Sequence, residues 1–62
     1  MTFAEMKRLK AQYRKATLRV ARLERIEPYT GAGNARTLLL ADLDRERREV
    51  ARLEALIREA AQ

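Results

Sequence analysis

The sequence predicts an all-α fold, an antiparallel two-helix hairpin packed in the manner of a coiled coil. The only proline, both glycines and the only asparagine fall between Glu27 and Ala35, and breakers clustered so tightly mark a turn. Both flanks are rich in Ala, Leu, Arg and Glu, which favour helix. Apolar residues in each flank recur at alternating steps of three and four, the spacing of a coiled-coil seam.

The 62 residues are enough for one domain. We expect a helix over about residues 2–27, a turn over 28–34 and a helix over about 35–61. Pro28 disfavours the helical conformation at position 27, so the first helix should end there. Asn34 is a suitable N-cap for the second helix. Thr37 is the alternative cap, and it would shorten that helix by one turn.

The short turn makes the two predicted helices antiparallel neighbours, and folding the chain about residue 31 places apolar residues opposite one another, including Phe3 opposite Ala60. One layer is polar, because Ala16 faces Glu46. Either Tyr13 fills the space while Glu46 extends to water, or a polar layer with Arg47 fixes the register. The predicted seam consists of Met6, Leu9, Tyr13, Ala16, Val20 and Leu23 with Leu39, Leu43, Val50, Leu53, Ile57 and Ala60.

The net charge of +5 lies entirely on the first half of the chain. Residues 1–27 contain eight Lys/Arg and three Glu, whereas residues 35–62 contain six of each sign. Away from the seam, the first helix should present a row of cations to a phosphate backbone, to an acidic protein or only to water. This row, the basic stripe, consists of Lys7, Arg8, Arg14, Lys15 and Arg22.

Several apolar residues fall outside the predicted seam, in a chain too short to bury a large core. The sequence has no Cys for disulfides, and without His as well it lacks the good zinc ligands. We therefore expect a second copy or a partner protein to cover these residues and complete a four-helix bundle, although single exposed apolar residues are also common on ordinary surfaces. This candidate apolar interface consists of Leu18, Ile26, Leu38, Leu40 and Leu56.

The composition argues against catalysis. The chain has no Ser, Cys or His, so the usual pairs of nucleophile and base cannot form. The carboxylates of the second half alternate with arginines at helical spacing, as on a solvated helix surface. Residues 30–34 could be imagined as a phosphate cradle, but they lack the lysine of a P-loop and a preceding strand, which favours an ordinary turn. We expect no catalytic residues, no metal site, no cofactor and no small-molecule substrate.

No apolar run is long enough for a signal peptide or a membrane span. We therefore expect the protein to act in the cytoplasm, or within a particle assembled there.

The segment Ala41–Ile57, preceded by the glycine-containing turn that ends in Thr37, resembles the last helix of small phage head–tail joining proteins. The resemblance implies a short chain of two helices with a glycine-bearing connection that assembles in rings at the neck of a virion. Members of that family commonly carry a small β-hairpin between the helices. The segment Glu27–Asn34 is too short and too rich in Pro and Gly for one.

These patterns lead to the hypothesis of a small non-catalytic interaction module, such as an adaptor, an inhibitor or a virion-assembly component. It would bind another protein through apolar helix faces and the basic stripe, and the isolated chain should not be a stable monomer. The alternative is an RNA- or DNA-binding hairpin that uses the basic stripe.

Overall fold

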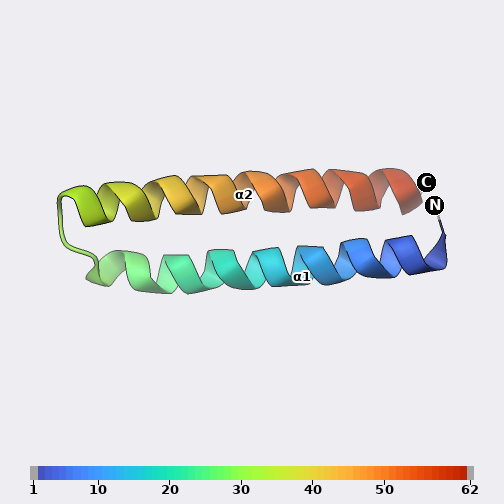
Figure 1. The fold of residues 1–62 in the computed structure, drawn as a ribbon, viewed down its shortest axis with the longest axis horizontal. Coiled ribbons are helices and arrows are strands. Elements are labelled where there is room, and N and C mark those ends of the chain that lie inside the picture. Colours follow the sequence, from blue (N-terminus) through green and yellow to red (C-terminus); the bar gives the residue numbers. More distant parts are fainter. Residues whose placement is uncertain (1, 62) are drawn as a thin grey trace.

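The computed structural model describes residues 2–61, which form a hairpin of two long helices (Figure 1). Helix α1 covers Phe3–Ile26, a 3-10 turn η1 covers Glu27–Tyr29, and helix α2 covers Asn34–Ala61. The helices run antiparallel, so that the start of α1 lies beside the end of α2 (Figure 1). No residue of 2–61 lies in a strand. The predicted all-α class and the packing of two helices against each other are therefore confirmed.

The helix bounds lie within one residue of the expected ones. The Thr2 hydroxyl caps α1 by accepting a hydrogen bond from the Glu5 amide at 3.2 Å. Helix α2 begins at Asn34, so Asn34 is the first helical residue and not, as predicted, the residue that caps the helix. Gly33 precedes it with a φ of 105°, a backbone conformation that suits glycine.

The connection between the helices contains the 3-10 turn η1, which the sequence did not predict. Glu27 keeps a right-handed helical conformation (φ −50°, ψ −46°), although Pro28 follows it. The prediction that α1 ends here was right, but the predicted reason was wrong, because Pro28 fits the first turn of η1. The Thr30 amide closes this turn on the Glu27 carbonyl oxygen at 3.2 Å.

The core lies along the seam between the helices and is thin. Only Ala16, Leu43 and Leu53 are fully buried among the described residues, and the other predicted seam residues are half-buried. Phe3 is 83% exposed, so the predicted layer of Phe3 and Ala60 does not form. The spacing of the seam positions explains this. Steps of three and four residues alternate along α1, and the step before Met6 is one of four residues. It leads to Thr2, so Phe3 lies beside the seam.

Glu46 forms an ion pair that joins the two helices. Its carboxylate accepts a hydrogen bond from Arg19 Nε at 2.9 Å, and its side chain is only 20% exposed. The interpretation in which Glu46 extends to water is therefore wrong. The polar layer exists, but its partner is Arg19, because Arg47 lies on the other flank and reaches Glu24 at 3.9 Å.

The hairpin is elongated, with principal extents of 45 × 14 × 12 Å. A radius of gyration of 14.3 Å exceeds the value of about 11 Å expected for a compact domain of this length. Nowhere in residues 2–61 is a helix both long enough and apolar enough to cross a membrane.

Candidate functional site

The cations of the two helices differ in whether they have acidic partners. Within residues 2–61, every arginine of α2 is in an ion pair, whereas Arg19 is the only cation of α1 in one. The unpaired cations of the described residues therefore all lie on α1. They include the whole basic stripe, and all of them are exposed. The set is Lys7, Arg8, Lys10, Arg14, Lys15, Arg22 and Arg25.

The local sequence explains this difference. On α2 the carboxylates stand three or four residues before arginines, as in the pairs Asp42–Arg45 (2.7 Å) and Glu54–Arg58 (3.0 Å). Two of the three glutamates of α1 and the turn, Glu24 and Glu27, bind arginines of α2 instead. The positive charge of α1 is consequently not neutralised within the hairpin.

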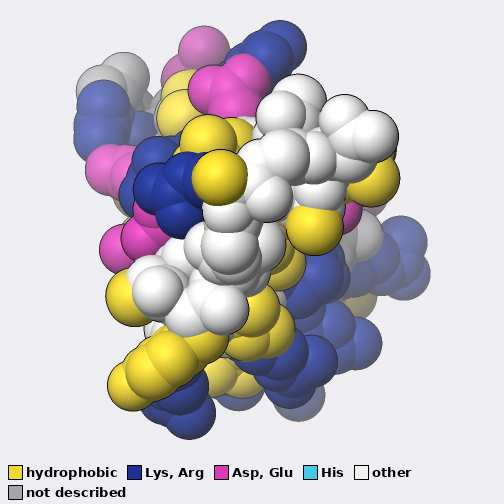
Figure 2. Space-filling model, turned by 90° about the vertical axis from the view of Figure 1, so that its left-hand side faces the viewer, with side chains coloured by type: hydrophobic (Ala, Val, Ile, Leu, Met, Phe, Trp, Pro, Cys, Tyr) yellow, Lys and Arg dark blue, Asp and Glu magenta, His cyan; other side chains and the backbone are white. Residues whose placement is uncertain are grey.

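Helical spacing places the basic stripe and Arg25 on the side of α1 that points away from α2, whereas Lys10 follows the seam residue Leu9 and lies on the flank. We call this side the α1 outer face. Residues seven apart lie on one line of the helix, and a line of apolar residues runs along the middle of the face. Viewed from the turn, the charged side chains in the half of the molecule formed by α1 are mainly Lys and Arg, beside hydrophobic side chains, whereas the α2 half mixes both signs (Figure 2). The apolar line is Ala4, Ala11 and Leu18, with Lys7 and Arg14 on one side and Arg8, Lys15 and Arg22 on the other.

The structure does not bring the candidate apolar interface into one surface. Four of its five residues are exposed and Leu56 is half-buried. Leu38 and Leu40 flank the seam residue Leu39, so they lie on opposite sides of the hairpin. Leu56 is about 24 Å along α2 from Leu40, and Leu18 lies on the α1 outer face. These five residues therefore point in several directions, and their burial by a partner stays a prediction.

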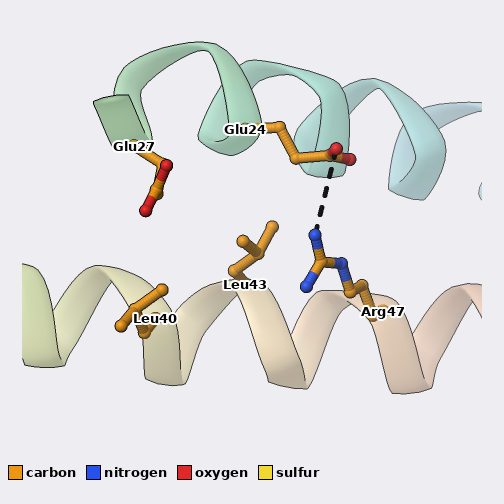
Figure 3. Close-up of a pocket in the computed structure, with 5 residues that line it drawn as sticks. All are labelled: Glu24, Glu27, Leu40, Leu43 and Arg47. Atoms are coloured by element: carbon orange, nitrogen blue, oxygen red, sulfur yellow. Dashed lines mark ion pairs between the residues drawn. The ribbon is translucent and has the colours of Figure 1, made fainter. Parts of the chain in front are cut away.

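Two shallow hollows differ in whether the charged residues that line them have acidic or basic partners. The first lies between the helices near the turn and is lined by Leu40, Leu43, Glu24, Glu27 and Arg47 (Figure 3). Figure 3 shows Glu24 and Arg47 reaching toward each other across the gap, where they form the 3.9 Å ion pair. Glu27 pairs with an arginine of α2, so the charges of this hollow are already neutralised.

The second hollow lies on the α1 outer face. Leu18 and Ala21 form its apolar part, and Arg22 and Arg25 form its rim. Neither arginine has an acidic partner within residues 2–61. This hollow therefore offers an apolar surface beside two available guanidinium groups.

Arg36 has a structural role that the sequence reasoning missed. Its guanidinium pairs with the Glu27 carboxylate and donates to the carbonyl oxygens of Glu27 and Thr30, each at 3.4 Å. These contacts tie the turn to α2. The sequence did contain a signal for this role. When the seam spacing is continued from Leu39 by one step of three residues toward the N-terminus, it leads to Arg36.

Two ionisable groups on α2, Glu49 and Arg52, shift the pKa of each other. Hydrogen bonds from Arg52, at 3.0 and 2.5 Å, hold the pKa of Glu49 below its ordinary value, so this carboxylate favours its charged form. The same contact raises the pKa of Arg52. Across residues 2–61, no group of three or more acidic side chains is placed to hold a metal ion.

Comparison of the chain with models of protein families, with curated proteins and with solved structures finds no match. The resemblance to phage head–tail joining proteins stays a prediction. The function must be inferred from the shape and charge of the hairpin.

Proposed function

We propose that this protein is a small non-catalytic interaction module that binds another protein through its helix surfaces. The observation that supports this most is the amount of exposed surface. A compact protein of 7.2 kDa exposes about 4,100 Å², whereas this hairpin exposes 5025 Å². The elongated shape thus leaves about 900 Å² more surface in water than a compact fold would, and a standard interface covers roughly 800 Å² of each partner.

The incomplete burial of the seam residues supports the same proposal. Most seam side chains, such as Leu9, Val20 and Ile57, are only half-buried, because no residue of 2–61 covers the two flanks of the hairpin. Two further helices packed against a flank would complete a four-helix bundle and remove this apolar surface from water. A second copy of the chain and a different protein are both suitable sources of these helices. An adaptor, an inhibitor and a virion-assembly component all fit this mode of action, and the last is the role implied by the phage resemblance.

Nucleic-acid binding is the second candidate, and the unpaired cations of α1 favour it. They extend from Lys7 to Arg25, about 27 Å along the helix, and could neutralise several phosphates. No exposed aromatic residue lies among them to stack on bases. Tyr13 is half-buried in the seam, and the exposed rings of Phe3 and Tyr29 are at opposite ends of the hairpin.

Affinity capture from the native host, with and without nuclease, tests the proposal when it is combined with sedimentation equilibrium of the purified chain. We expect either a protein partner that stays bound after nuclease treatment or self-association that increases with concentration. A 7.2 kDa monomer at all concentrations, with no protein retained after nuclease, would overturn the proposal. Retention that depends entirely on nucleic acid would favour the second candidate.

A further inference from the structure

The α1 outer face combines an apolar line in its middle with cations on both sides, and Arg25, seven residues after Leu18, continues this line. Leu18 is 60% exposed at the centre of the face, in line with Ala4 and Ala11. Cations flank this line on both sides, and none of them has an acidic partner within residues 2–61. A ligand that matches this face needs an apolar stripe bordered by negative charge on two sides.

The dimensions of the face suit a helix. From Ala4 to Arg25 it extends about 30 Å, the length of a helix of about 20 residues. The small side chains of Ala4 and Ala11 allow a second helix to approach closely, within the usual interaxial distance of 8–10 Å. The hollow beside Leu18 and Ala21 can receive an apolar side chain, and Arg22 and Arg25 at its rim can bind a neighbouring carboxylate.

A second copy of this chain does not supply that negative charge. Two α1 outer faces would bring cations against cations, which is unfavourable. Helix α2 of a second copy offers no excess of negative charge, because within residues 2–61 five of its six carboxylates pair with arginines. The partner of this face must therefore be a different molecule.

A phosphate backbone satisfies the cations but not the apolar middle of the face. Phosphodiester groups would leave Leu18 in water, whereas an apolar helix stripe would remove it from water. Burying a leucine side chain contributes substantially to binding.

Building on the interaction function proposed above, we propose that the α1 outer face binds an amphipathic helix of a different, acidic protein. The apolar stripe of that helix covers Ala4, Ala11 and Leu18. Its Asp and Glu residues pair with the cations on both sides of the stripe. Charge complementarity determines the partner, and the leucine distinguishes a protein from a nucleic acid.

The test uses the whole chain and a synthetic amphipathic peptide of about 20 residues, with a leucine stripe flanked by glutamates. The control probes are the same peptide with lysines in place of the glutamates and a nucleic-acid duplex of similar length. Fluorescence anisotropy measures each affinity, and circular dichroism confirms that each variant is folded. We expect the acidic peptide to bind and the lysine peptide not to bind.

Two leucine variants provide the matched comparison. Leu18→Ala should weaken peptide binding about tenfold, because this leucine is buried by the peptide. Leu38→Ala removes an equally exposed leucine from another face and should change the affinity by less than about twofold. The double variant Arg14→Glu/Lys15→Glu should weaken binding by at least about tenfold.

Three outcomes would overturn the inference. They are equal effects of the two leucine variants, failure of the acidic peptide to bind, and tighter binding of the duplex with no effect of Leu18→Ala. The affinity capture described above separates this failure from failure of the proposed function. A host protein that binds Arg14→Glu/Lys15→Glu as well as the unchanged chain would leave the interaction function intact and exclude this face.

Discussion

The two helices are alike on the side where they meet and different on the side that faces water. Both bring apolar residues to one seam at the same spacing. On its outer side, α2 places carboxylates beside its arginines, whereas α1 places cations beside cations. Lys10 and Arg14, four residues apart, repel each other and destabilise an isolated helix slightly. Most charges on the outer side of α2 are therefore paired, whereas those on the outer side of α1 are an unpaired positive excess within residues 2–61.

The ion pairs of α2 are not a large source of stability. The pairs Asp42–Arg45 and Asp44–Arg48 have side chains that are at least half exposed, and such pairs contribute about 0.2–1 kcal/mol each at most. Their main consequence is a surface of balanced charge. The comparison of α1 with α2 thus concerns the availability of charge for binding more than the stability of the fold.

The largest expected effect comes from breaking the seam that the two helices share. Leu53→Ala should reduce the free energy of unfolding by about 2–5 kcal/mol, because Leu53 is almost completely buried. Leu38→Ala, at a position 67% exposed, should change it by less than about 0.5 kcal/mol. Thermal melting followed by circular dichroism measures both. An unchanged melt for Leu53→Ala would mean that the helices do not pack as described.

The next effect concerns Arg19, which within residues 2–61 is the one cation of α1 that has an acidic partner. A double-mutant cycle with Arg19→Ala and Glu46→Ala should give a coupling energy of about 0.5–1 kcal/mol, since the pair is direct and Glu46 is largely covered. The same cycle for Glu24 and Arg47, which are 3.9 Å apart and more exposed, should give a smaller value. Equal coupling energies in the two cycles would show that the Arg19–Glu46 pair is no stronger than the Glu24–Arg47 pair.

Reversing one charge should raise the stability of the hairpin on α1 and lower it on α2. Lys10→Glu places a carboxylate four residues before Arg14 and should stabilise the hairpin by about 0.3–0.5 kcal/mol. Arg48→Glu places a carboxylate beside Asp44 and should destabilise it by a similar amount. Urea unfolding at low salt checks both, and added salt should reduce both effects. Destabilisation by Lys10→Glu would show that repulsion between Lys10 and Arg14 does not weaken the hairpin.

The smallest effect is the acid response of the Glu49–Arg52 pair. The pKa of Glu49 is lower in the folded state than the ordinary value of 4.5, so the pair stabilises the fold above about pH 4.5. This stabilisation is lost as the pH falls through the folded-state pKa. Glu49→Gln should therefore melt at a lower temperature than the unchanged chain at neutral pH. A difference that persists in strong acid would assign the effect to something other than the charge.

Local patterns in the sequence were enough to predict the hairpin. The breakers between Glu27 and Ala35 located the turn, and the spacing of three and four located the seam. The predictions that were wrong concern which residues meet across the hairpin. Glu46 was expected either to extend to water or to form a polar layer with its neighbour Arg47, whereas its partner is Arg19, which is close only after folding. The candidate interface leucines were chosen because they are apolar and lie outside the seam, and Leu38 and Leu40 lie on opposite sides of it.

The central claim is that binding depends on the α1 outer face and not on net charge alone. The most direct test compares Arg14→Glu/Lys15→Glu on α1 with Arg45→Glu/Arg52→Glu on α2, which change the net charge equally. The account predicts that the protein partner captured from the host loses its affinity for the α1 variant and retains it for the α2 variant. Equal losses for the two variants would contradict the account.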